Sequence, residues 1–525
     1  MTANNAPGIR PKVEEREFQS VQKDRYYSTY VPNPLVRENA FRGMAADAAA
    51  LPAFDGARDR LPSPRWDGHE AEIASYWKAW ELAFGNLRAP AEGSGFPANY
   101  IDTAFNDCLF MWDSCFIMMF AKYGRRAFAF QRTLDNLYAK QHPDGFICRQ
   151  IGTGDGADRF HRHDPASTGP NVLAWAEWEY FQASGDLDRL ARVFPVLAAY
   201  HRWLRAYRTW PDGGYWSSGW GAGMDNQPRM PAELPYQADE FYHGHLVWVD
   251  ACLQQLLSAR LVLLMAGLLG RAEDVRDFAA ESERLARFVD EKLWDEETAF
   301  YHDLKPDGGR LGMKSIGAYW ALIAGAVPNA RLARFAAHLE NPSEFNRPHR
   351  IPSLSADDPN YQPQGDYWRG GVWMPTNYMV LRGLSGHGRD ALAHEIARGH
   401  VGHVADVLRR TGTIWENYAP ESIAQGVPAK PDFVGWSGLA PIAVLLEYVF
   451  GLRADAAEGR LVWDVRLLEE HGVDRYPFGP EGVLELSCQA RRSAGEKPAI
   501  TVRGSVPVTL VLRWAGGEET IRVAP

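Results

Sequence analysis

Two carboxylates that lie far apart in the chain, Asp225 and Glu416, each stand among glycine and aromatic residues. Asp225 follows the segment SGWGAGM, and Glu416 lies in the segment TIWENYAP. Hydrolysis of a glycosidic bond uses two carboxyl groups, one that protonates the leaving oxygen and one that attacks or activates water. Both segments are expected to be loops between helices, and such loops often carry function on a rigid scaffold. The pair therefore predicts a glycoside hydrolase.

The surroundings of Asp225 suit the acid of this pair. Trp216 and Trp220 precede it, and an aromatic wall desolvates a carboxyl group and raises its pKa, as proton donation requires. Gly223 permits close approach of the backbone to a ligand, and Asn226 offers an amide at the same turn. Asp225 could instead cap the next turn, but a cap needs no aromatic wall.

Glu416 has one competitor for the role of base, which is Glu421. Trp415 and Tyr418 bracket Glu416, whereas Glu421 follows Pro420 and could simply face solvent. We therefore predict that Glu416 is the base and that Tyr418 contributes to the substrate site.

Three further segments supply candidates for substrate binding. In QGDYWRGGVW (364–373), an arginine between tryptophan and glycine is a positioned donor for hydroxyl or carboxylate groups, although an ion pair that anchors the loop is an alternative. In FMWDS (110–114), the aspartate either caps a helix or binds a pair of sugar hydroxyls. FICRQ (146–150) places a second arginine in a long loop. The candidates are Trp112, Asp113, Arg149, Gln150, Asp366, Tyr367, Trp368, Arg369 and Trp373.

Metal and cofactor signals are weak. The histidine pairs 161/163 and 243/245 lack the HExxH or cysteine-rich context of a metal site, so we expect no metal and no cofactor. The five scattered cysteines have no CxxC spacing and predict reduced, buried thiols.

Helical periodicity indicates the elements that must position these segments. Twelve helices are predicted near 69–84, 108–123, 126–140, 171–184, 187–207, 243–268, 272–293, 315–325, 330–338, 372–384, 388–410 and 436–450. Paired by alternating short and long loops, they predict a mainly α fold, a toroid of six helical hairpins. The long loops 141–169, 208–241, 340–371 and 411–435 hold nearly all candidates and would gather at one end.

The two ends of the chain differ from this pattern. Residues 1–65 show no sustained period and predict an irregular N-terminal arm, ahead of a catalytic domain at 66–452. After that, alternating β-branched segments separated by turns predict a small antiparallel β module at 453–525. Its expected role is packing and capping.

Composition narrows the partners. The chain of 525 residues has 56 basic and 66 acidic side chains and a net charge of −10, with no basic stripe that would favour nucleic acid. The N-terminus has no apolar run typical of a signal peptide, and the apolar stretch 261–269 is too short for a bilayer. We expect a cytoplasmic protein with a small carbohydrate substrate; the oligomeric state stays open.

In chain order, the segments MWDS (111–114), GMDN (223–226), DYWRG with VW (366–373) and ENY (416–418) resemble motifs of glycoside hydrolase families 63 and 37. The segment PNVLAWA (170–176) is also typical of this group. The resemblance covers about residues 70–450 and is strongest to the mannosylglycerate and glucosylglycerate hydrolase branch. It implies an (α/α)6 barrel that hydrolyses an α-glycoside with inversion.

Carried over by position, the resemblance implies that Asp225 is the general acid and Glu416 the general base. An inverting mechanism places these carboxyl groups about 6.5–9.5 Å apart. Gly371 stands where the family commonly has proline, and the arm and β module are not features of the minimal hydrolases. Arg149 or Arg369 would hold a glycerate carboxylate, and the donor-sugar subsite would be lined by Trp112, Asp113, Tyr367, Trp368, Arg369 and Trp436.

Three other functions are compatible with parts of the pattern. A sugar epimerase or isomerase on the same barrel would need the histidines at 161, 163, 243 and 245 to converge. A phosphorylase would lack the base at Glu416 and need a phosphate pocket there. A non-catalytic carbohydrate-binding protein would keep the tryptophans without needing two separated acids.

Overall fold

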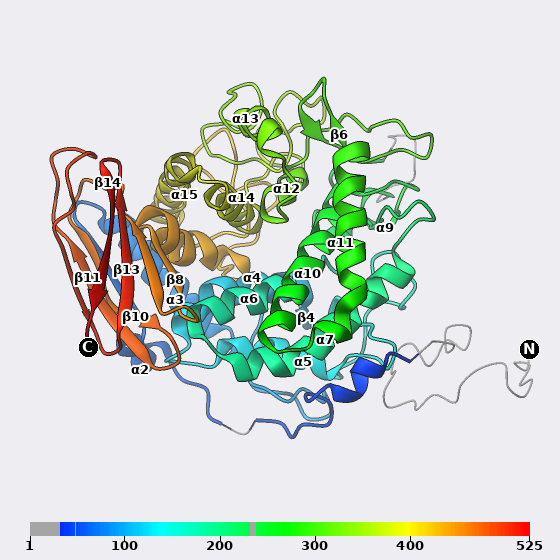
Figure 1. Ribbon diagram of the computed structural model, residues 1–525, viewed down its shortest axis with the longest axis horizontal. Helices are drawn as coiled ribbons and strands as arrows, with labels where there is room; N and C mark the ends of the chain where they lie inside the picture. Colours follow the sequence, from blue (N-terminus) through cyan, green and yellow to red (C-terminus); the bar gives the residue numbers. More distant parts are fainter. Residues whose placement is uncertain (1–31, 48, 231–237) are drawn as a thin grey trace, which may run out of the picture.

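The computed structural model describes residues 32–47, 49–230 and 238–525, so the predicted tip of the arm, within 1–31, lies outside the described residues. Helices fill most of the molecule, and the strands near the C-terminus gather at one end (Figure 1). The helical elements are η3 (Pro34–Glu38), α2 (Phe54–Ala57), η4 (Arg58–Arg60), α3 (Glu70–Gly85), α4 (Met111–Ala121), η5 (Lys122–Gly124), η6 (Phe130–Arg132), α5 (Thr133–Ala139), α6 (Leu173–Ser184), α7 (Leu187–Tyr207), α8 (Gly219–Ala222), α9 (Ala238–Phe241), α10 (Val249–Leu268), η7 (Ala272–Val275), α11 (Arg276–Phe288), η8 (Val289–Leu293), η9 (Ile316–Tyr319), α12 (Trp320–Ile323), α13 (Asn329–Ala337), α14 (Met374–Gly386), α15 (Asp390–Thr411), η10 (Trp436–Leu439) and η11 (Ala440–Val449).

Six helical segments contact one another in a closed circuit. α4 contacts α6, α6 contacts α10, α10 contacts α12, α12 contacts α14, and both α14 and α4 contact η10. A second set packs against this circuit: α7 and α11 on α10, α15 on α14, and α3 on α15 and η11. Every residue of α4 and of η11 is buried, whereas α11 and α15 keep a charged, solvent-facing side. Apolar residues all around a helix predict burial on all sides, and α4 and η11 meet that condition.

The predicted helices are present, with corrections at several ends. The segment 108–123 begins with a short strand, β4 (Cys108–Phe110), because its first residues pair with β5 (Gln150–Gly152) before the helix starts. The helix expected at 243–268 begins only at Val249, and the one expected at 126–140 shortens to η6 and α5. Small two-stranded pairs, β2 (Leu87–Arg88) with β3 (Tyr100–Ile101) and β6 (Trp294–Asp295) with β7 (Phe300–Tyr301), lie between helices.

The apolar stretch 261–269 falls mostly within α10, a helix of 20 residues. Among the described residues, α10 is the one helix long and apolar enough to cross a membrane. The stretch 261–269, considered alone, therefore underestimates the length of this apolar helix. Of its most apolar window, 67% is buried inside the protein, and α10 packs against α6, α7, α11 and α12, as the core helix of a globular protein does. All five cysteines are free and buried, as expected.

The C-terminal strands form two four-stranded sheets. One has the order β1-β10-β11-β12 and the other β14-β13-β9-β8. Leu484, Leu486 and Cys488 alternate into the buried face of β11, as Leu510 and Leu512 do in β13. The strands are β1 (Ser63–Trp66), β8 (Leu452–Asp455), β9 (Arg460–Asp464), β10 (His471–Phe478), β11 (Gly482–Cys488), β12 (Ile500–Gly504), β13 (Val508–Trp514) and β14 (Gly517–Val523).

Two details of these sheets differ from the expected antiparallel module. β13 pairs in parallel with β9, because the chain passes through β10, β11 and β12 in the other sheet before it returns, and such a crossover is what parallel pairing requires. In addition, β1 from the N-terminal part of the chain pairs antiparallel with β10.

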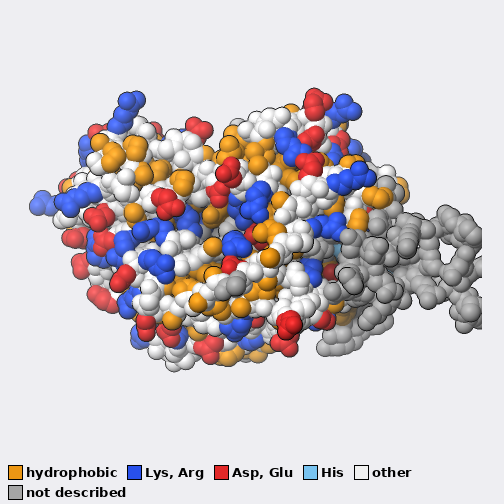
Figure 2. All heavy atoms as spheres, turned by 90° about the horizontal axis from the view of Figure 1, so that it is seen from below, with side chains coloured by type: hydrophobic (Ala, Val, Ile, Leu, Met, Phe, Trp, Pro, Cys, Tyr) orange, Lys and Arg blue, Asp and Glu red, His pale blue; other side chains and the backbone are white. Residues whose placement is uncertain are grey.

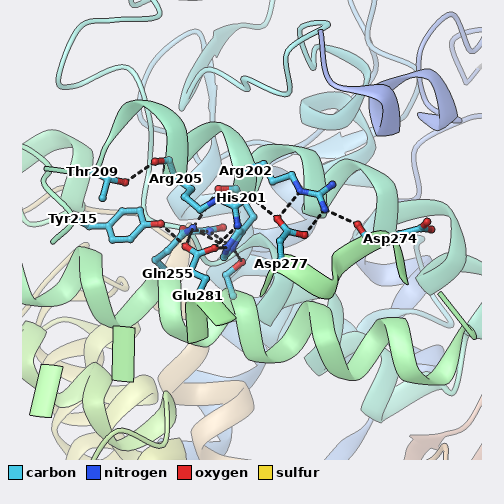
Figure 3. A network of polar contacts seen from close by, with 11 residues as sticks. His201, Arg202, Arg205, Thr209, Tyr215, Gln255, Asp274, Asp277 and Glu281 are labelled. Carbon is cyan, nitrogen blue, oxygen red and sulfur yellow. Dashed lines mark hydrogen bonds and ion pairs between the residues drawn. The ribbon is translucent and has the colours of Figure 1, made fainter. Parts of the chain in front are cut away.

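A polar network fixes α7, α10 and α11 to one another (Figure 3). The Tyr215 hydroxyl donates to Glu281 at 2.5 Å, and the carboxylate of Glu281 lies 3.1 Å from His201 Nε2 and 2.9 Å from Arg205 Nη1. Tyr215 stands at the start of the segment that leads to α8, so this network holds the base of the loop that carries Asp225.

Candidate active site

Two adjoining cavities open where the long loops meet. The inner one, of about 510 Å³, is the less open of the two and largely aromatic; the outer cleft, of about 1140 Å³, is more open to solvent. Phe105, Trp220, Asp225 and Tyr367 line both, so these residues mark the boundary. The inner cavity is also lined by Phe110, Trp112, Asp113, Arg149, Gly169, Gly223, Trp368 and Trp436, and the outer cleft by Asn226, Glu240, Asp366, Glu416, Pro428, Ala429 and Lys430.

Asp225 stands at the boundary on a loop that is fixed on both sides. Before it, the Ser218 hydroxyl accepts from Gly221 N at 3.1 Å and caps α8. After it, Asn226 donates to Asp366 O at 2.9 Å and accepts from Trp368 N at 2.8 Å. Burial raises the pKa of Asp225 to about 7, because desolvation of the carboxylate outweighs the favourable charge of Arg149. A carboxyl group in this condition can carry a proton at neutral pH.

Glu416 is held in a different way. It is 3% exposed, and each of its carboxylate oxygens accepts one hydrogen bond, Oε1 from the Tyr367 hydroxyl at 2.8 Å and Oε2 from Lys430 N at 3.1 Å. Trp436 Nε1 donates to its backbone carbonyl at 2.9 Å. Burial raises the pKa of Glu416, and the two hydrogen bonds oppose that rise by favouring the ionised form. The two carboxyl groups therefore face one cleft from unlike environments.

Asp113 and Arg149 border the inner cavity together. Asp113 is 6% exposed, and burial raises its pKa to about 8, with Arg149 opposing the rise and the charges of Asp225 and Glu416 adding to it. The guanidinium of Arg149 lies 4.6 Å from the ring centroid of Phe160 and 4.9 Å from that of Trp220, and its Nε donates to Ala166 O at 2.7 Å. This pair combines acceptors and donors as recognition of sugar hydroxyls requires.

Tryptophans form much of the inner wall. Trp368 stacks on Trp373 with ring centroids 4.1 Å apart and an interplanar angle of 1°, and Trp112 packs edge-on against Phe116 at 4.7 Å. Trp112 Nε1 is buried without a hydrogen-bond partner among the described residues, so a donor is left for a ligand hydroxyl. Flat aromatic faces around a small cavity suit the C–H faces of a sugar ring.

Strained backbone places Tyr367. Asp366 and Tyr367 have φ of +36° and +63°, a left-handed conformation that is uncommon for residues other than glycine and is retained mainly where the surroundings enforce it, often at functional sites. The two hydrogen bonds to Asn226 hold this backbone conformation in place. In this conformation the Tyr367 hydroxyl donates a hydrogen bond to Glu416.

The structure does not bring every predicted residue to the cavities. Trp216 packs against Trp210 and His243, and Gln150 begins strand β5. Arg369 donates to Asn226 O at 3.1 Å and lies 3.3 Å from Asp239, which is the loop-anchoring alternative. Trp373 lies behind Trp368, and Tyr418 is fully buried beside His349. These five residues support the walls or lie away from them, because tertiary contacts, and not residue type, set the direction of a side chain in a loop.

The competing groups are occupied elsewhere. Glu421 is paired with Arg347 through two hydrogen bonds at 2.6 and 2.8 Å and accepts from the Tyr361 hydroxyl at 2.6 Å, so the pKa of Glu421 falls below its usual value. The histidines of the two pairs do not line either cavity. No cluster of metal-ligating side chains occurs in the part of the chain that the structure describes.

Sequence reasoning missed several residues that line the cavities. Phe105 and Phe110 pack edge-on at 5.9 Å, and Phe105 is 43% exposed. Lys430 reaches the backbone carbonyls of Ala104 and Phe105 and ties that loop to the Glu416 loop. Glu240 comes from α9. Phe110, directly before MWDS, and Phe105, five residues earlier, were a usable aromatic signal; Gly169, Glu240, Pro428, Ala429 and Lys430 offered none.

Gly223 is required by the aromatic wall. Its φ is +70°, and a Cβ atom there would lie 2.9 Å from the Trp112 ring. Gly223→Ala is therefore expected to push Trp112 into the inner cavity and to lower kcat/KM by about 10–100-fold. Steady-state kinetics test this against Gly270→Ala, which has a φ of +66° and nothing within 4 Å. The control should lose about 1–2 kcal/mol of stability and no activity; equal kinetics in both variants would contradict the expectation.

Comparison with known proteins agrees with this geometry. A family model described as the mannosylglycerate hydrolase MGH1-like glycoside hydrolase domain matches residues 108–432, more than half of the chain. The mannosylglycerate hydrolase of Thermus thermophilus is 28% identical over 54% of this chain and 83% of its own. A probable mannosyl-oligosaccharide glucosidase of Schizosaccharomyces pombe is 26% identical over 48% of this chain but only 34% of its own length.

Solved structures show a similar fold. The GH63 mannosylglycerate hydrolase from Thermus thermophilus in complex with glucose superposes with a TM-score of 0.56 at 24% identity, over 70% of this chain and 99% of that one. The neutral trehalase of Saccharomyces cerevisiae superposes with a TM-score of 0.52 at 12% identity, over 67% and 73%. At these identities the likeness concerns the fold alone.

Proposed function

Because the chain belongs to the family of mannosylglycerate hydrolase MGH1-like glycoside hydrolases, we propose that it cleaves an α-linked glucosyl or mannosyl unit from a small glycoside or oligosaccharide with inversion. That it is a glycosidase follows from the family; the sugar, the linkage and the stereochemistry are the proposed part. The observation that carries it is the pair of unlike carboxyl groups, Asp225 with a pKa raised to about 7 and Glu416 with hydrogen bonds on both oxygens, at one cleft.

The geometry supports a division of roles. The glycosyl unit occupies the inner cavity, where Trp112, Trp368 and Trp436 surround it. Asp113, in the same lining, forms hydrogen bonds with the hydroxyl groups of the sugar. Asp225, at the boundary, donates its proton to the leaving oxygen as the bond breaks. Glu416 takes a proton from the water that attacks the anomeric carbon from the other side, and the Tyr367 hydroxyl and Lys430 N orient its carboxylate.

The scaffold belongs to the same proposal. The closed circuit of α4, α6, α10, α12, α14 and η10 with its outer helices supports an (α/α)6 toroid at residues 66–452, preceded by an N-terminal arm at 1–65 and followed by a β module at 453–525. On the face seen in Figure 2, acidic and basic side chains intermix without a single-sign field, which is compatible with a small carbohydrate as the partner. Cytoplasmic location remains part of the proposal.

The reaction is tested by a proton NMR time course. Trehalose, kojibiose, glucosylglycerate, mannosylglycerate and related α-glycosides are supplied to the wild type and to Asp225→Asn. The β-anomer of the released sugar should appear first, and the variant should lose this activity on unactivated substrates. Initial release of the α-anomer would show a retaining reaction and overturn the proposed mechanism.

A further inference from the structure

The outer cleft is strongly acidic. Among the described residues that line it, four carry carboxyl groups, Asp225, Glu240, Asp366 and Glu416, and one carries a positive charge, Lys430. Because Asp225 lines both cavities, its proton is delivered at their boundary, and the leaving group must extend into this cleft.

The cations at the cleft are already engaged. Lys430 Nζ donates to the backbone carbonyls of Ala104 and Phe105, the latter at 3.1 Å, and lies 5.3 Å from the centroid of the Phe105 ring. Arg369, behind the wall, lies 3.3 Å from Asp239 and 3.9 Å from Asp366. Both side chains tie loops together: Arg369 is paired with carboxylates, and Lys430 is held by backbone carbonyls.

Among the described residues, Arg149 is a third cation near the boundary between the two cavities, and it lines the inner cavity. Its Nε donates to Ala166 O, and its guanidinium lies between Phe160 and Trp220. Its charge acts on both Asp113 and Asp225, where it opposes the effect of burial. Arg149 therefore serves the inner cavity and is not among the described residues that line the outer cleft.

We propose that the outer cleft is a leaving-group subsite for uncharged polyols and sugars, and that its carboxylates exclude a leaving group that carries a carboxylate. This inference rests on the proposed function and narrows it. It separates this chain from the relatives that are named mannosylglycerate hydrolases, because glycerate is an anion.

The chemistry of the cleft fits an uncharged leaving group in two ways. Hydroxyl groups donate hydrogen bonds, and the carboxylates of Glu240 and Asp366 line the cleft as acceptors. Asn226, which carries an amide, lines the same cleft. Phe105, which is 43% exposed, and Trp220 give an apolar face for carbon-bound hydrogens. An added carboxylate would meet the carboxylates of Glu240, Asp366 and Glu416, with Lys430 the one cation among the described residues of the lining, which is unfavourable in a partly desolvated site.

The test uses a matched pair of substrates. Glucosylglycerol and glucosylglycerate share sugar and linkage and differ in one group, a CH2OH against a carboxylate; the mannosyl pair covers the other sugar. At pH 6 and low ionic strength, kcat/KM should be at least tenfold higher for the glycerol compound. Added salt should narrow the difference by raising the rate on the glycerate compound, because salt screens the repulsion. Equal rates, or a preference for the glycerate compound, would overturn the inference.

Charge-removing variants assign the effect to the cleft. Glu240→Gln and Asp366→Asn should each raise the relative kcat/KM for glycerate at least threefold, and asparagine keeps the left-handed backbone at 366 accessible. Glu458→Gln, which removes an exposed carboxylate from the turn between β8 and β9, should leave the ratio unchanged. An unchanged ratio in both cleft variants would contradict the inference.

Failure of the proposed function would be recognised separately. If no compound of either pair is hydrolysed, the assignment of the reaction to these substrates fails. Isothermal titration calorimetry of the wild type with the same compounds then measures the charge preference as a difference in binding affinity, independently of catalysis. Tighter binding of the glycerol compound would support the inference, and tighter binding of the glycerate compound, or equal binding, would overturn it.

Discussion

Replacing Glu416 by glutamine is expected to lower kcat by about 10²–10⁴-fold, the usual contribution of a general base, with little change in KM. Glutamine keeps the size of the side chain, and its amide oxygen can still accept from Tyr367 or from Lys430 N, so the walls should remain in place. What is lost is the negative charge that takes a proton from the attacking water. Single-turnover kinetics beside ligand-binding measurements separate this loss from a loss of affinity.

Glu421→Gln provides the matched control, five residues along the same segment. Its carboxylate is bound by Arg347 and Tyr361, so this change should lower thermal stability and leave kcat near the wild-type value. If the two variants exchanged these results, the base would have been assigned to the wrong glutamate.

Asp225→Asn is expected to have an effect of similar size that depends on the leaving group. A poor leaving group such as a sugar hydroxyl needs the proton, and its hydrolysis should fall by about 10²–10⁴-fold. A glycosyl fluoride needs little acid assistance, so its hydrolysis should fall far less. Glu416→Gln should lose activity on both substrates, because the attack of water is common to them. Equal losses on both substrates in Asp225→Asn would contradict its role as the acid.

The same residue sets the alkaline side of the pH profile. The reactive form of Asp225 is protonated, and burial raises its pKa to about 7, so kcat/KM should fall as the pH rises through about 7. Glu416 must be ionised, so activity should also fall as the pH drops through its pKa. In Asp225→Asn the alkaline limb near 7 should vanish from the residual activity on glycosyl fluoride. A limb that stays there would belong to another group.

The parts of the site that could be predicted from sequence are those in which residue type and chemistry coincide. Asp225 and Glu416 were identified because carboxylates among tryptophans and glycines have few structural uses, and the cavities do contain both. Trp112, Asp113, Trp368 and Trp436 were reached through the ordered motifs. Helix positions followed from periodicity, since buried helices such as η11 are apolar on every side.

The remaining features depend on information that local sequence does not carry. Trp216 and Trp220 are equally aromatic and four residues apart, yet only Trp220 reaches the cavities, because side-chain direction in a loop is set by tertiary contacts. Lys430 enters the cleft through hydrogen bonds to a loop more than three hundred residues earlier. The parallel pairing of β9 with β13 likewise could not be predicted from the alternation of buried and exposed side chains, because this alternation has the same period in parallel and antiparallel strands.

The pairing of β1 with β10 has a consequence for synthesis. Arg65 meets Asp474 across a separation of 409 residues, and a ribosome that adds about 5–20 residues per second releases the second partner about 20–80 s after the first. During that interval the backbone hydrogen-bonding groups of β1 that will pair with β10 are unpaired and accessible to chaperones and to neighbouring nascent chains. A chain that stopped ahead of β10 would leave β1 permanently unpaired, so a truncation at one strand would expose the edge of another strand 409 residues away in sequence.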